Sequence, residues 1–168
     1  MNEGLLVVIQ ILTFLFGAII FSSLNKVITI TKVKIFNVIV GGALALLLAV
    51  KYGYNFRLIT VFSFFLLLTA ETYIDVTTMK IPNSLVLLIL VVAGFSFLAF
   101  PEITIRQRIM GFFVVSTILL FITLIVPGSF GGGDIKLMAA CGVFLGGKLC
   151  LIAFIMALFL GGGYGVAL

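Results

Sequence analysis

The chain has 168 residues, of which 64% are hydrophobic and 9% charged, and its formal net charge is +5. Soluble domains average roughly 25% charged residues, so the composition predicts an integral membrane protein. The sequence has no histidine and two cysteines, which excludes Ser-His and Cys-His nucleophiles and a zinc site with the usual ligands. Carboxylates are therefore the groups left for chemistry. We expect no metal, no cofactor and no nucleic-acid partner, and we expect both cysteines to be buried apolar residues.

Six apolar segments follow one another along the chain, near the length of roughly 20 helical residues that crosses a hydrocarbon core. We expect spans at residues 4–24, 35–50, 58–74, 84–100, 109–126 and about 149–160. The last boundary is open, because a helix could begin near Ile135 and bend at the following glycines. A cleaved signal peptide is disfavoured for the first segment by Glu3 and by the length of the apolar run. The sequence thus predicts an all-α membrane protein, a polytopic bundle of about six transmembrane helices forming one domain over residues 1–168.

Two of the five acidic residues follow segments that end on the same side of the predicted bundle. Asp75 follows the third segment, and Asp134 follows the fifth and closes the run Gly131-Gly132-Gly133. Because two crossings separate these ends, we expect both carboxylates on one face of the membrane. Glu71 precedes Asp75 by one helical turn and shares its helix face.

A pair of neighbouring carboxylates can hydrolyse a peptide bond without a metal ion. Such a pair titrates as a unit, so one carboxyl is protonated while the other is a base. The base takes a proton from water, and the neutral acid polarises the scissile carbonyl and later protonates the leaving amine. The glycines before Asp134 offer backbone without side chains, against which an extended substrate can lie. The sequence therefore indicates peptide hydrolysis with Asp75 as the partner of Asp134.

Both aspartates lie in stretches that resemble the signatures of the type IV prepilin peptidases, membrane aspartic proteases of the GxGD class. The run GGGDIKLMAACG at residues 131–142, with Gly146 four residues on, is similar to the second signature. Asp75 with Ile81-Pro82-Asn83 resembles the first. The resemblance extends from the third segment onward. It implies an endopeptidase of type IV pilus or protein-secretion systems that cleaves the basic leader of prepilin or pseudopilin-like precursors at the cytoplasmic face of the inner membrane.

Residue by residue, the resemblance implies catalytic roles for Asp75 and Asp134 and matches Gly131 and Gly133 to the glycines of GxGD. Neighbouring residues are expected to bind substrate or shape the site: Glu71, Lys80, Pro82, Asn83 and Lys136. Longer family members carry an extra cytoplasmic segment with cysteine motifs and also methylate the new N-terminus. Here the connection at residues 25–34 has no cysteine, so we expect cleavage without methylation.

These residues also have simpler structural interpretations. Asp75 could be a helix-end acid that pairs with Lys80, and Asp134 could be the N-cap of the next helix. Glu71 either contacts a basic substrate leader or is a protonated packing acid. The others could be interfacial lysines with solvated ammonium groups, or residues that set the loop and helix start which aim Asp75: Lys80, Lys136, Pro82 and Asn83.

Three rival functions stay open at this point. Paired carboxylates also mark ion or proton pathways in transporters, although these are expected near the bilayer midplane and within inverted repeats. A presenilin-like protease shares GxGD but would have tyrosine before the first aspartate, where this chain has Ile74. A non-catalytic pilus-assembly protein would keep its activity without either acid. Basic residues are distributed almost evenly between the two sides of the predicted bundle, so the cytoplasmic orientation comes from the resemblance alone.

Overall fold

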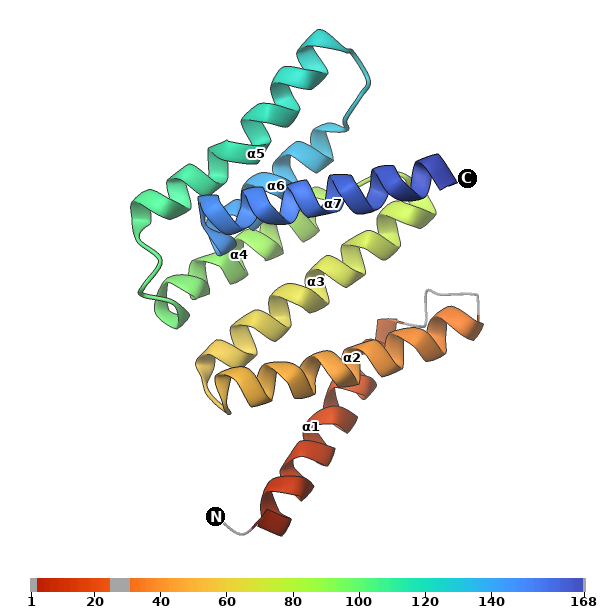
Figure 1. Cartoon of the computed structure of the whole chain (residues 1–168), viewed down its shortest axis with the longest axis vertical. Helices are drawn as coiled ribbons and strands as arrows, with labels where there is room; N and C mark the ends of the chain where they lie inside the picture. Colours follow the sequence, from red (N-terminus) through yellow and green to blue (C-terminus); the bar gives the residue numbers. More distant parts are fainter. Residues whose placement is uncertain (1–2, 25–30, 168) are drawn as a thin grey trace. The chain divides into compact units, whose positions relative to one another are not determined.

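A computed structural model describes residues 3–24 and 31–167, and in these ranges the backbone forms seven α-helices and no strand (Figure 1). The all-α prediction is confirmed. The chain divides into two compact units, Met1–Thr77 and Thr78–Leu168. The single-domain expectation stays a prediction. The helices are α1 (Glu3–Leu24), α2 (Thr31–Tyr52), α3 (Phe56–Thr78), α4 (Asn83–Ala99), α5 (Ile105–Ile125), α6 (Gly132–Leu145) and α7 (Gly147–Ala167).

Each of the six predicted segments corresponds to one helix, and the sixth, at about 149–160, lies within α7. The alternative of a single helix that begins near Ile135 and bends at the glycines was wrong, because α6 and α7 are separate helices on either side of Gly146. Gly146 has φ 77° and ψ 164°, a backbone conformation open essentially to glycine alone, so the α6 helix ends there. Lys32 and Lys34, assigned to a connection, lie within α2, whereas Lys26 lies outside the described residues.

Helix length and composition bear on how the chain meets a bilayer. Two helices of the described ranges, α3 and α5, are long and apolar enough to cross a hydrocarbon core. The prediction of about six crossings is therefore not confirmed by these criteria and stays a prediction. The remaining apolar stretches in the described ranges are shorter: Val7–Ile20, Val38–Tyr52, Asn83–Ala99 and Gly147–Leu160.

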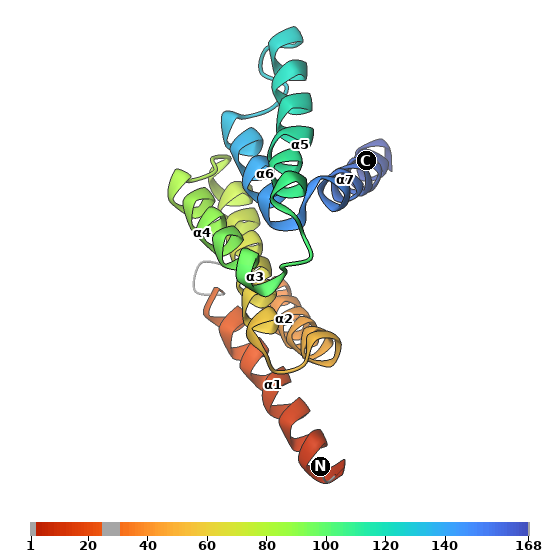
Figure 2. The same cartoon turned by 90° about the vertical axis from the view of Figure 1, so that its left-hand side faces the viewer.

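In the first unit, α1 and α2 pack closely at small residues (Figure 2). A Cβ on Gly17 would lie 2.5 Å from the Cβ of Ala45 and 2.6 Å from a backbone oxygen of α2, so the contact leaves room for hydrogen only. Gly53, with φ 69°, makes the turn that follows α2. The side-chain oxygen of Asn55 accepts a hydrogen bond from the Arg57 backbone N–H at 3.1 Å, at the start of α3.

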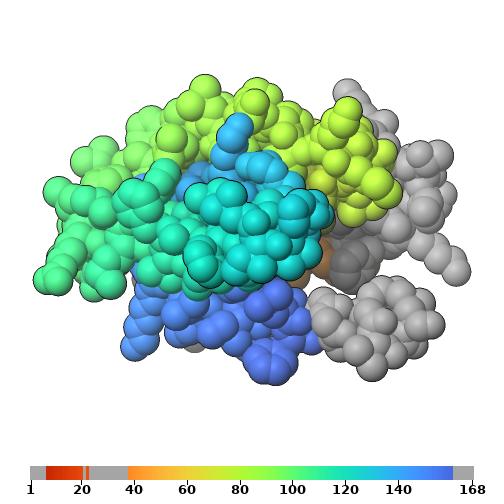
Figure 3. All heavy atoms as spheres, turned by 90° about the horizontal axis from the view of Figure 1, so that it is seen from above, coloured from red at the N-terminus to blue at the C-terminus, as the bar shows by residue number. Residues whose placement is uncertain are grey.

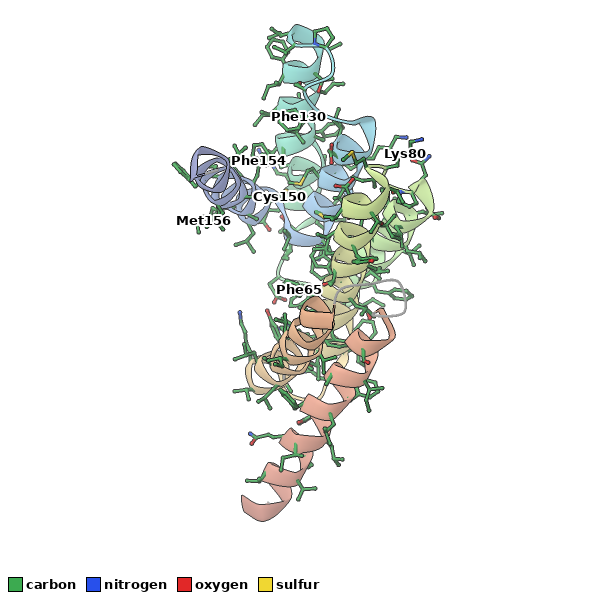
Figure 4. The ribbon with its side chains drawn as sticks, turned by 90° about the vertical axis from the view of Figure 1, so that its right-hand side faces the viewer. Phe65, Lys80, Phe130, Cys150, Phe154 and Met156 are labelled. Carbon is green, nitrogen blue, oxygen red and sulfur yellow. The ribbon has the colours of Figure 1, made fainter. Side chains whose placement is uncertain are left out.

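The second unit is arranged around α6, which packs against α4, α5 and α7 (Figure 1). The backbones of α5 and α6 meet at Gly111 and Gly142, where a Cβ on either glycine would lie 2.0 Å from the carbonyl oxygen of the other. Small residues permit such close approach between helices. A buried apolar cluster of α5 and α7 contains Cys150, and Phe130 of the α5–α6 connection and Phe154 of α7 pack against it, as Figure 4 labels them. Both cysteines are buried, as predicted.

Candidate functional site

The turn that carries Asp134 forms the start of α6. Gly131 is the N-cap residue, with extended backbone, and Asp134 occupies the third helical position. Its Oδ2 accepts a hydrogen bond from the Gly131 backbone N–H at 3.0 Å. A carboxylate in the first turn also interacts favourably with the helix dipole. The interpretation of Asp134 as the N-cap was therefore wrong by three residues, because glycine occupies the cap and the acid closes back onto it.

The three glycines of this turn differ in what surrounds them. A Cβ on Gly133 would lie 2.7 Å from the Cβ of Ile81, and a Cβ on Gly131 would lie 3.1 Å from Oδ2 of Asp134. Apart from its chain neighbours and the nearby backbone of its own helix, no atom in the described part of the chain lies within 4 Å of a Cβ built on Gly132. A side chain is thus obstructed at the two positions matched to the glycines of GxGD, and accommodated at the position between them.

The end of the first motif meets the second motif at this turn. Pro82 is the N-cap residue of α4, which agrees with its interpretation as a residue that sets the helix start. Asn83 follows as the first residue of α4, and its Oδ1 accepts a hydrogen bond from Nζ of Lys136 at 3.2 Å. Together with the packing of Gly133 against Ile81, this bond joins the loop before α4 to the first turn of α6. Both Asn83 and Lys136 are exposed.

The other predicted acids lie on α3, in the first unit. Asp75 is half-buried and lies three residues before the end of α3. The sequence had placed Asp75 after the third segment, but in the structure it belongs to the helix. Glu71, one turn earlier, is 2% exposed, which favours its interpretation as a packing acid. Because Asp75 and Asp134 lie in different units, their convergence stays a prediction.

The connection from α3 to α4 presents a solvated lysine. Met79 has φ 52°, a left-handed conformation that is uncommon for a residue with a side chain and that ends α3. Lys80 follows and is exposed, and Figure 4 shows its side chain directed away from the helices of its unit. This exposure favours a solvated lysine over a group buried in the site.

Sequence reasoning missed one polar residue with a large structural role. Arg108, in the first turn of α5, is 1% exposed, and its Cζ lies 4.2 Å from the centroid of the Phe97 ring. All five N–H donors of its guanidinium have acceptors. The acceptors are the carbonyl and hydroxyl oxygens of Ser96 and the carbonyl oxygens of Phe100, Ile103 and Val143. No sequence signal distinguishes Arg108 from the exposed Arg106 two residues earlier.

A groove opens beside the glycine turn, between α4, α5 and α6. Its volume is about 490 Å³, and Asn83 and Lys136 contribute polar groups to a lining that is otherwise mostly apolar. In Figure 3 a small group of α6 atoms reaches the surface between α4, in yellow-green, and α5, in green to teal. Among the described residues, no three His, Cys, Asp or Glu side chains gather into a metal site.

The described part of the chain is all-helical and strongly apolar, and Asp134 lies in a glycine turn at the start of α6. The class is therefore a helical, apolar protein with a candidate carboxylate site. The chain belongs to the type IV leader peptidase family, whose model matches residues 60–166 and so includes both Asp75 and Asp134. This confirms the resemblance to prepilin peptidases.

One curated relative is the prepilin leader peptidase/N-methyltransferase of Bacillus subtilis (strain 168), which is 30% identical to this chain over 118 residues. The alignment covers 70% of this chain and 48% of the relative, so the chain spans about half the relative's length. No solved structure matches the chain.

Proposed function

We propose that the chain is a diaspartyl membrane endopeptidase that cleaves the leader peptide from prepilin or pseudopilin-like precursors. Asp75 and Asp134 form the catalytic pair. Membership of the type IV leader peptidase family supports a peptidase, and the matched range includes both acids. The observation that carries the proposal is the junction of the two motifs, where Gly133 packs against Ile81 and Lys136 donates to Asn83.

In this mechanism one carboxylate is ionised and the other is protonated. The ionised carboxylate takes a proton from water as the water oxygen adds to the scissile carbonyl carbon. The protonated carboxyl donates a hydrogen bond to the carbonyl oxygen, where negative charge develops. The tetrahedral intermediate then collapses, the C–N bond breaks, and the leaving nitrogen receives a proton from the acid. Water thus supplies OH to the new carboxyl group and H to the new amine, and no metal or cofactor takes part.

The placement of Asp134 suits this role. Its bond from the Gly131 N–H holds the carboxylate at the start of α6, and the neighbouring glycines leave backbone accessible beside it. An extended peptide held through its backbone needs such bare backbone as a partner. Gly131 and Gly133 therefore shape the site, while Pro82 and Asn83 set the start of the adjacent helix.

We place the protein in the cytoplasmic (inner) membrane as a multi-pass protein whose active site faces the cytoplasm. The apolar composition and the lengths of α3 and α5 support membrane insertion. We further propose that cleavage occurs without methylation of the new N-terminus, because residues 25–34, which the sequence assigned to the connection between the first two segments, contain no cysteine.

The test is cleavage of a prepilin-like substrate, with a basic leader before an apolar helix, by the purified protein and by Asp75→Asn and Asp134→Asn. Each substitution should reduce the rate by about 10²- to 10⁴-fold, the range of a lost general acid or base. Glu102→Gln, at an exposed carboxylate between α4 and α5, is the matched control and should retain cleavage. Mass spectrometry of the product, with S-adenosylmethionine supplied, should show an unmethylated N-terminus. Retained cleavage in either aspartate variant would contradict the two-carboxylate mechanism.

A further inference from the structure

The groove between α4, α5 and α6 has polar groups at one end and a mostly apolar lining elsewhere. Asn83 is the first residue of α4 and Lys136 the fifth of α6, so both mark the end of the groove where these two helices begin. Apolar side chains of all three helices line the rest, among them Leu87, Leu120 and Ala139. Ligand pockets of about 300–1,000 Å³ commonly combine an apolar lining with a few polar groups, and this groove of about 490 Å³ falls in that range.

The polar end of the groove carries a positive charge. Among the described residues of the lining, Lys136 is the one charged side chain. Its ammonium group has three N–H donors and gives one to Oδ1 of Asn83, so two remain for an anionic group. Asp134 precedes Lys136 by two residues, or about 200° of helix rotation, and is not part of the lining. The nearest acid in the sequence therefore lies on another face of α6 and does not neutralise the groove.

The rest of the groove has the character of a surface that meets lipid. From residue 84 to residue 99 the α4 wall contains no charged residue, so its apolar run begins directly after Asn83. The α5 wall belongs to a helix that is long and apolar enough to cross a hydrocarbon core. Large apolar side chains of both walls are exposed: Leu87 is 61% exposed, Phe113 56% and Leu120 48%. The positive end thus lies where the apolar part of the groove begins, as headgroups lie at the edge of acyl chains.

We infer that this groove binds an anionic phospholipid, with the phosphate at Lys136 and Asn83 and one acyl chain along the apolar lining. Basic pockets between transmembrane helices bind phosphate-bearing headgroups. An apolar protein segment in the same groove would leave the ammonium group without a counterion, whereas a phosphate supplies one. From Asn83 to Leu90 the α4 wall covers roughly 10 Å of helix, which fits within one leaflet of roughly 15 Å. The inference rests on membrane insertion and not on peptide hydrolysis.

The experiment uses tryptophan fluorescence, because the chain has no tryptophan and one introduced residue reports lipid at its own position. Leu87→Trp and Leu120→Trp place the reporter on the two walls of the groove. Leu88→Trp places it on α4 at a residue that is 49% exposed and, among the described residues, outside the groove lining. Each variant is reconstituted into mixed vesicles of phosphatidylglycerol and phosphatidylcholine, with bromine on the acyl chains of one lipid at a time. Because bromine quenches nearby tryptophan, the two titrations give the binding constant of phosphatidylglycerol relative to phosphatidylcholine.

Both groove reporters should prefer phosphatidylglycerol about fivefold, the scale of one lysine near an anionic membrane surface. Leu88→Trp should show no such preference. When Lys136→Gln is added to Leu87→Trp, the preference should be lost, although glutamine keeps an N–H donor, and Lys136→Arg should retain it. Lys148→Gln removes the same charge from an exposed lysine of α7 that, among the described residues, lies outside the lining. It is the matched control and should leave the preference unchanged.

Several outcomes would overturn the inference. A preference as large at Leu88→Trp as in the groove would be a general attraction of anionic lipid to a basic protein. A preference that survives Lys136→Gln, or that Lys148→Gln also removes, would mean that Lys136 does not bind the headgroup. Equal quenching by both lipids at both groove reporters would mean contact with acyl chains alone. Quenching by neither lipid would mean that protein, a second copy or a substrate segment, covers the groove. Peptide cleavage enters none of these measurements, so the proposed peptidase function stands or falls separately.

Discussion

The two ends of the α4–α6 pair in the second unit use polar groups in opposite ways. At one end the Arg108 guanidinium is buried, and five hydrogen bonds tie it to the end of α4, the loop that follows and α6. At the other end Asn83 and Lys136 are exposed and share one bond of 3.2 Å. A buried guanidinium whose donors are all satisfied has no capacity left for a ligand. The exposed end retains that capacity, and it carries the aspartate.

This difference indicates that one end of the helix pair stabilises the fold and that the other end is available to bind a ligand. The Arg108 end fixes the relative position of α4, α5 and α6, because a guanidinium bound to several backbone carbonyls resists sliding of any of them. The Gly111–Gly142 contact adds close backbone packing between α5 and α6. The opposite end can then present Asp134 and the groove on a rigid support, which a site that positions a reacting bond requires.

The largest expected effect is the loss of folding stability caused by Arg108→Leu. The carbonyl oxygens of Ile103 and Val143 would lose their Arg108 donor, whereas those of Ser96 and Phe100 would each keep a backbone N–H donor. An unsatisfied buried polar group costs about 1–3 kcal/mol, so the loss of stability should be about 3 kcal/mol. The measurement is the melting temperature of the purified protein in detergent. Arg106→Leu, at an exposed arginine of the same helical turn, should change stability by less than about 0.5 kcal/mol. Equal melting temperatures for the two variants would remove the structural role of Arg108.

Arg108 also illustrates what the sequence could and could not predict. Helix positions followed from apolar runs of membrane-spanning length. The proposed site residues came from an acid placed after glycines, a second acid on the same side and the family resemblance, and their convergence stays a prediction. Arg108 carries no such pattern, because its burial depends on carbonyl groups that α4 and α6 bring together only in the folded chain. The boundary before the last segment stayed open for a similar reason. The sequence shows glycines at positions 146 and 147, but whether a helix bends or ends there depends on the positive φ that Gly146 adopts.

The next largest effect is expected on the rate of leader cleavage, when glycines of the turn before Asp134 are replaced by alanine. Two neighbouring glycines should differ in how much activity is lost. Gly133→Ala places a Cβ 2.7 Å from that of Ile81, which is too close for two carbon atoms. The loop before α4, which contains Ile81, must therefore move away from the turn that carries Asp134. Misplacement of a reacting group by about 1 Å can reduce a rate by about 10²-fold, and we expect a loss of cleavage of that order. Gly132→Ala has open space around its Cβ among the described residues and should retain cleavage.

Leader cleavage under identical conditions, with folding checked by melting temperature, measures this contrast. Similar losses in Gly132→Ala and Gly133→Ala would show that backbone flexibility of the run matters more than its contact with Ile81. Activity retained in both would separate the loop before α4 from catalysis altogether.

The smallest effect is expected from the bond between Lys136 and Asn83. Hydrogen bonds at exposed positions contribute little to stability, so Lys136→Met and Asn83→Ala should each change the unfolding free energy by about 0.5 kcal/mol. Their effect should be seen in kcat/KM, because the bond aligns the loop before α4 with the turn of Asp134.

A double-mutant cycle on kcat/KM measures the alignment itself. Residues in direct contact typically couple by about 0.5–3 kcal/mol, and an exposed single bond belongs at the lower limit. We therefore expect the double variant to lose less activity than the two single losses combined. Additive losses would mean that the two side chains act independently on the substrate. A stability loss as large as that of Arg108→Leu would instead mean that both ends of the helix pair serve to hold the fold, because an exposed bond that merely aligns a site has no such energy to lose.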